Sequence, residues 1–110
     1  MAYDEKLAQR IRDLIGDEAG VAEKKMFGGL AFLVGGNMAV AASGQGGVLA
    51  RCDPADTDAL VLTTPAEVMV MRGREMAGWL RIPAQEIASR DALAGWVARG
   101  VAYARSLPSK

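Results

Sequence analysis

The chain has 110 residues, 51% of them hydrophobic, and its thirteen basic and thirteen acidic residues cancel to a formal net charge of zero. A chain of this length buries roughly two thirds of its unfolded surface, so we expect one globular domain over residues 1–110. A neutral chain has no global field to draw it onto phosphate backbones or anionic membranes. We therefore do not expect direct nucleic-acid binding.

The residue types that are missing exclude several kinds of chemistry. There is no histidine, which removes Ser-His-Asp and Cys-His nucleophilic systems, an imidazole base and nearly all small zinc sites. Cys52 is the only cysteine, so no disulfide can form within the chain. The start of the chain lacks the pattern of a secretory signal, and no apolar run approaches the ~18 residues of a transmembrane helix. We predict a cytoplasmic protein without a membrane span, metal or cofactor.

The first half of the chain predicts one helix followed by three strands. Apolar residues recur at helical spacing over residues 3–16, which favours an amphipathic helix. Glycine-rich connections of hairpin length, at 35–37 and 43–47, then separate three apolar runs, so these strands should be antiparallel. The predicted strands cover residues 25–33, 37–43 and 47–52.

The second half predicts a short helix, two strands and a final helix. Asp53 before Pro54 is typical of a helix start, and Ser89 is the expected cap of the last helix, which ends before Pro108. Between them, an alternating segment over 68–71 and a segment over 78–82 are expected to be strands, joined by a turn over 72–74.

The resulting order, α-β-β-β-α-β-β-α, is α+β. It predicts a single domain in which an antiparallel sheet of about five strands has the N- and C-terminal helices on one face. Met69 and Met71 share one face of their strand, opposite Val68 and Val70. If one of these apolar faces looks away from the helices, a homodimer or a protein partner would cover it.

Glycine pairs suggest a phosphate-binding loop, but their context favours a structural role. Gly28-Gly29 lies within a strand pattern, where it predicts a bulge, and Gly35-Gly36 connects two strands. Neither pair opens a helix, as a phosphate loop would. Trp79 and Trp96 are likewise expected to anchor the core rather than to stack on bases.

Basic residues are the best candidates for binding a partner or an anion. Lys24 and Lys25 precede the first predicted strand, and several arginines lie near predicted strand ends. The alternative is that they are solvated charges that protect sheet edges from aggregation. The candidates are Lys24, Lys25, Arg51, Arg72 and Arg74, with Arg81 nearby.

Other reactive side chains predict little chemistry. Cys52 lies between Arg51 and Asp53 at a helix start that could stabilise a thiolate, but the aspartate opposes this, and a lone cysteine is usually a small buried apolar residue. The acidic pairs, such as Asp56 and Asp58, have nothing to separate their pKa values. We assign no catalytic residues.

The most specific motif is Lys24-Lys25-Met26-Phe27-Gly28-Gly29, followed by Gly36-Asn37 and later by Gly78-Trp79. This pattern resembles the N-terminal domain of the TfoX/Sxy family, whose best-known members are regulators of bacterial competence. The resemblance extends over nearly the whole chain and implies an α+β domain, here without the C-terminal domain that those regulators carry. It supplies no catalytic residue or cofactor, and the motif residues from Met26 onward are interpreted as structural.

Two functional hypotheses follow. The first is a small protein-interaction module, an accessory in transcriptional or competence-type regulation, that presents a sheet face or the Lys24-Lys25 edge to a partner. The alternative is a binder or enzyme for a small anionic metabolite that uses basic residues near the glycine turns. A deep pocket containing Arg51, Arg72 or Arg74 would favour the alternative.

Overall fold

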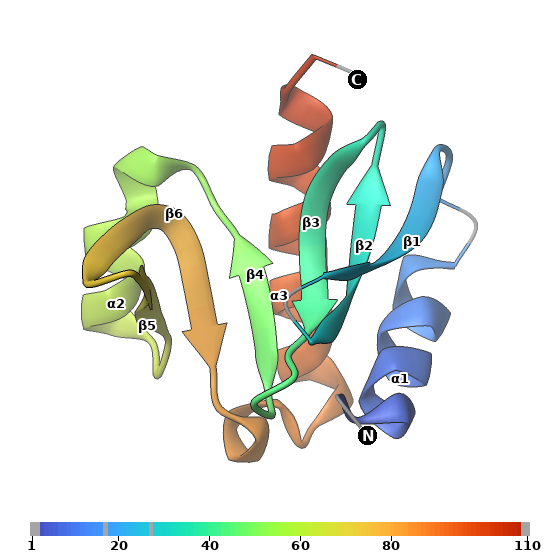
Figure 1. The fold of residues 1–110 in the computed structure, drawn as a ribbon, viewed down its shortest axis with the longest axis horizontal. Helices are drawn as coiled ribbons and strands as arrows, with labels where there is room; N and C mark the ends of the chain where they lie inside the picture. The colour runs from blue at the N-terminus through green and yellow to red at the C-terminus, as the bar shows by residue number, and fades with distance from the viewer. Residues whose placement is uncertain (1–2, 17, 27, 109–110) are drawn as a thin grey trace.

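The structure is a computed structural model that describes residues 3–16, 18–26 and 28–108. Its described helices and strands follow one another in the order helix, four strands, helix, two strands, helix (Figure 1). They are α1 (Glu5–Ile15), β1 (Val21–Met26), β2 (Gly29–Val34), β3 (Asn37–Ala42), β4 (Val48–Arg51), α2 (Thr57–Thr63), β5 (Glu67–Met71), β6 (Arg74–Ile82) and α3 (Arg90–Ser106). Short 3-10 turns, Pro54–Asp56 and Ala84–Ile87, precede α2 and α3.

The six strands form one antiparallel sheet in the order β1-β2-β3-β4-β6-β5. Helix α3 lies behind the middle of the sheet in Figure 1, with α1 beside it and α2 next to the β5–β6 hairpin. The predicted α+β fold, with an antiparallel sheet and flanking helices, is therefore confirmed. The last hairpin does not simply extend the sheet, because β6 pairs with β4 and leaves β5 at the edge.

The main departure from the predicted strands is at the start of the sheet, where one expected strand over 25–33 is two. β1 and β2 pair so that Met26 faces Gly29, which places a tight turn where a bulge was expected. Gly28 has φ +75°, and a side chain on Gly29 would overlap the carbonyl oxygen of Ala42. The four central residues of β1 are exposed, so this edge strand lacks the apolar pattern by which strands are recognised.

Side-chain caps fix where the helices begin. The Asp4 carboxylate accepts hydrogen bonds from the backbone N–H groups of Lys6 and Leu7 at the start of α1, and Ser89 caps α3 as predicted. Asp53 also caps, but it caps the 3-10 turn, so α2 proper starts at Thr57. Within the described ranges, no helix is long and apolar enough to cross a membrane.

The main core lies between the helices and one face of the sheet, which we call the helix face. Ile11 of α1, Phe32 of β2 and Leu93 of α3 are fully buried there. Helix α3 approaches β3 closely at Gly100, where a Cβ atom would overlap the backbone of Ala39. The larger fully buried side chains on this face also include Val40, Val48, Leu80, Ile82 and Ile87.

A bidentate ion pair joins α1 to β1 and predicts a pH effect on stability. Arg12 Nε lies 2.6 Å and Nη2 2.7 Å from the two carboxylate oxygens of Glu23, and this hydrogen bonding lowers the pKa of Glu23. The pair therefore stabilises the fold fully above pH 4.5, the ordinary glutamate pKa, and its contribution is lost as the pH falls through the lowered folded value.

We expect this pH-dependent contribution to be about 0.5 kcal/mol, because the Arg12 and Glu23 side chains are 42% and 35% exposed. Urea unfolding of the wild-type protein and of Glu23→Gln should show that the variant loses stability at pH 7 and that the difference shrinks towards pH 3. A constant difference across this range would contradict the assignment.

Candidate interaction surface

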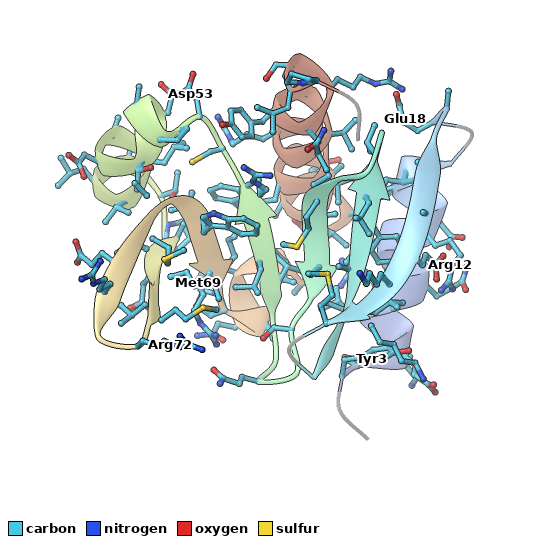
Figure 2. All side chains as sticks on the ribbon, turned by 45° about the horizontal axis from the view of Figure 1, so that its top comes forward. Tyr3, Arg12, Glu18, Asp53, Met69 and Arg72 are labelled. Carbon is cyan, nitrogen blue, oxygen red and sulfur yellow. The ribbon has the colours of Figure 1, made fainter. Side chains whose placement is uncertain are left out.

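The second face of the sheet carries its own apolar cluster, and we call it the open face because the helices pack on the other side. Its floor comes from the central strands: Ala31, Met38, Ala41 and Leu49 are 1–6% exposed. Larger, partly buried side chains pack around this floor. They are Met26, Leu33, Met69 and Trp79. Met69 is seen over the sheet in Figure 2.

The open face gathers five of the six methionines of the chain. Directly opposed residues in an antiparallel pair project to the same side, so Met76 lies beside Met69, and Met71 is paired with Arg74 at the hairpin end. Met26 and Met38 extend the group onto β1 and β3. The expectation that Met69 and Met71 share a face opposite Val68 is confirmed. Methionine is unbranched and polarizable, so such a surface adapts to differently shaped partners.

The strand register separates the two candidate lysines. Lys24 and Lys25 lie within β1, not before the first strand, because β1 begins at Val21. Lys24 is paired with Ala31 and projects to the open face, whereas Lys25 is paired with Leu30 and projects to the helix face. Both are exposed. A change of charge at each position therefore tests one face at a time.

The arginines add positive charge to the open face. Arg51 is paired with Trp79, and Arg81 with Leu49. Arg74, which starts β6, is on the same side through its pairing with Met71. Glu67 is paired with Arg81, so the same register places this acidic residue on the open face as well. Arg72 instead occupies the β5–β6 turn with φ +53°, at the tip of the hairpin (Figure 2).

Arg51 is the most tightly held of the candidate side chains. Its guanidinium carbon lies 4.5 Å from the centroid of Trp79 and 5.0 Å from that of Tyr103, which reaches it from α3. Trp79 was expected in the core, but it is partly buried on the open face, whereas Trp96 does lie in the main core. Sequence reasoning missed Tyr103, because nothing in the local pattern of α3 links it to β4.

The remaining motif residues have backbone roles. Gly36, at φ +83°, forms part of the β2–β3 turn, and the buried Asn37 after it donates from Nδ2 to the carbonyl oxygen of Pro108 at 2.9 Å. Gly78 donates from its N–H to Thr57 Oγ1 at 2.8 Å and accepts from the N–H of Cys52. The predicted motif residue Phe27 lies outside the described residues.

Cys52 is buried beneath the start of α2. Burial raises the pKa of its thiol, which outweighs the weak contact with Thr57 Oγ1 at 3.9 Å. The helix-start position therefore does not produce a stabilised thiolate, and the small apolar interpretation of this cysteine is the one that the structure supports.

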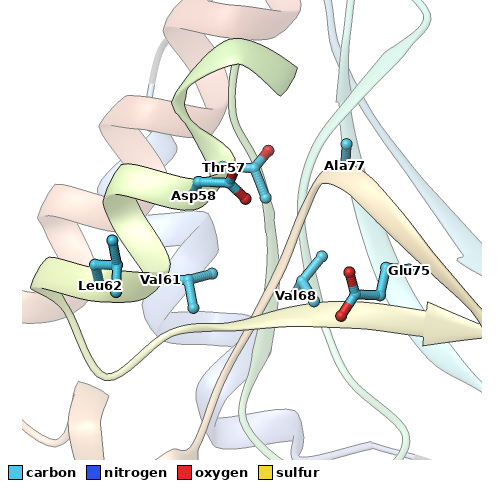
Figure 3. A pocket seen from close by; sticks show the side chains of 7 residues that line it. All are labelled: Thr57, Asp58, Val61, Leu62, Val68, Glu75 and Ala77. Carbon is cyan, nitrogen blue, oxygen red and sulfur yellow. The ribbon is translucent and has the colours of Figure 1, made fainter.

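A groove of about 500 Å³ runs between α2 and the β5–β6 hairpin, on the side away from the open face (Figure 3). Val61 and Val68 form its apolar walls, with Leu62 at the rim, where its side chain is 85% exposed. Asp58 and Glu75 line it with negative charge. Neither this groove nor the shallow hollow beside Cys52 and Tyr103 is lined by Arg51, Arg72 or Arg74.

Comparison with known protein families agrees with the motif. Curated proteins and solved structures gave no significant match. The family model described as the TfoX N-terminal domain matches residues 13–104, which takes in all six strands, α2 and most of α3. The chain therefore belongs to the TfoX N-terminal domain family.

Proposed function

We propose that this chain is a small cytoplasmic protein-interaction module, an accessory in transcriptional or competence-type regulation, and that it binds its partner through the open face. The observation that carries the proposal is the concentration of five methionines and Trp79 on the sheet face opposite the helices. Flexible apolar side chains around a tightly packed floor are suited to a protein surface, and a Trp among them is a typical interface anchor.

The charges around the open face support a partner with acidic residues. Lys24 on β1 and Arg74 and Arg81 on β6 outnumber Glu67, the acidic residue on the same face, while the chain as a whole is neutral. The same charges oppose a symmetric dimer through this face, because two copies would bring like charges together. A different protein, and not a second copy, is the occupant that these charges favour.

The two adjacent lysines provide the test. We expect Lys24→Glu to abolish capture of a stoichiometric protein partner from the native cell lysate, because it places a negative charge beside Ala31 on the open face. Lys25→Glu has the same composition and net charge but lies on the other side of β1, so it should retain capture. Nuclease treatment and mass spectrometry of the eluate separate a protein partner from nucleic acid.

Two outcomes would contradict the proposal. If both variants capture the partner equally well, the open face is excluded as the binding surface. Loss of capture with Lys25→Glu alone would place the interface on the other side of the sheet. Thermal melts of both variants provide the folding control, since each lysine is exposed and its replacement should change stability little.

A further inference from the structure

The guanidinium of Arg51 is held in one orientation by rings from two different elements. It lies at the end of β4, beside Trp79 of β6, with Tyr103 of α3 on a second side. Arginine stacks on aromatic faces through its planar, delocalised charge, and desolvation strengthens this attraction. An ordinary surface arginine loses side-chain entropy when it binds an anion. Arg51 has already lost this entropy in folding, because the two rings hold its side chain.

This fixed cation has no anionic partner among the described residues. Its Nε atom is buried and makes no hydrogen bond, and the two described ion pairs of the chain, Arg12 with Glu23 and Arg105 with Glu18, involve other residues. Arg51 makes no hydrogen bond to any side chain or backbone atom of the described ranges through its terminal nitrogens either, and its side chain is only partly buried. Its donor capacity is therefore unused.

The surroundings of Arg51 restrict the chemistry of a ligand. Most open-face residues around Arg51 are apolar, namely Leu49 on the same strand and Met38 and Met69 in the same cluster, while Arg81, paired with Leu49, adds a second cation. An anion that approaches Arg51 from this face lies against these apolar side chains, which favours a ligand that carries apolar groups of its own. A glutamate or aspartate on an amphipathic peptide does so, and its planar carboxylate matches the guanidinium fork.

We propose that Arg51, clamped between Trp79 and Tyr103, is a carboxylate-binding subsite that receives an acidic side chain from an amphipathic segment of a partner protein. This inference rests on the proposed function, because it places the subsite within the open face. Apolar side chains of the segment cover the methionines, and its carboxylate takes the unused donors of Arg51. A free phosphate would use the same donors without the apolar contacts, and the experiment below separates the two ligands.

The test follows the Nε–H signal of Arg51 by NMR in the full-length wild-type protein. The probes are a short blocked peptide with glutamates beside a row of leucines, the same peptide with glutamine in place of glutamate, and inorganic phosphate. We expect the glutamate peptide to shift the Arg51 and Trp79 signals saturably, and the glutamine peptide to bind about tenfold more weakly. Saturation by phosphate with an equal or stronger affinity would overturn the peptide assignment, as would equal binding of the two peptides.

Two substitutions of arginine by lysine serve as a matched pair. Arg51→Lys keeps the charge but loses the planar fork, so we expect it to weaken binding of the glutamate peptide about tenfold, whereas Arg90→Lys, at an exposed position at the start of α3, should change the affinity less than twofold. If Arg51→Lys binds the glutamate peptide as tightly as the wild-type protein does, positive charge alone accounts for the binding and the subsite is overturned. If the peptide fails to shift Arg51 while Lys24→Glu still abolishes partner capture, the interaction module stands and the carboxylate subsite does not.

Discussion

Replacing Gly100 by alanine is expected to destabilise the protein by about 3 kcal/mol, although the same change normally stabilises a helix. Gly100 lies on the buried side of α3, and a Cβ atom there would overlap the carbonyl oxygen of Ala39 and lie 2.9 Å from its carbonyl carbon. These are backbone atoms of a central strand, so they cannot move aside as a flexible side chain would. Helix α3 would have to shift away from β3.

Gly95 is the matched control for this prediction, because it lies in the same helix and a Cβ atom added to it would meet no other atom within 4 Å. Gly95→Ala should raise the free energy of unfolding by up to about 1 kcal/mol through helix propensity alone. Urea unfolding of both variants measures the difference. Stabilisation of similar size by both substitutions would show that α3 does not approach β3 as closely as the structure indicates.

Phe32→Ala is expected to cost about 4 kcal/mol, which is a large part of the total stability of a domain of this size. Phe32 is fully buried in the main core between β2 and the helices. Its removal leaves a cavity that the surrounding strands cannot fill, because the backbone on both sides is fixed by pairing with β1 and β3. Thermal and urea unfolding should both show the loss.

Leu62→Ala is the contrasting variant for the core prediction. The Leu62 side chain is 85% exposed at the rim of the groove between α2 and β5–β6, so its truncation should change stability by less than about 0.5 kcal/mol. A loss comparable with that of Phe32→Ala would show that α2 packs differently from the structure described above.

Local patterns in the sequence determined most of the elements, because each pattern depends on residues close together in the chain. The apolar repeat over 3–16 indicated α1, Ser89 marked the start of α3, and Gly35-Gly36 gave the β2–β3 turn with both glycines at positive φ. The α+β class followed from the order of these elements. β1 was recognised only in its last residues, since an exposed edge strand carries no alternating apolar signal.

The candidate surface depended on tertiary structure, because it is made by the register between strands and by the packing that brings distant elements together. The sequence indicated the methionines and the basic residues, but only the pairing of Lys24 with Ala31 assigned this lysine to the open face and its neighbour Lys25 to the other. The contact of Arg51 with Tyr103 joins β4 to α3 across 52 positions of the chain, and no local pattern encodes such a separation. Sequence determined the inventory of this surface, and packing decided its arrangement.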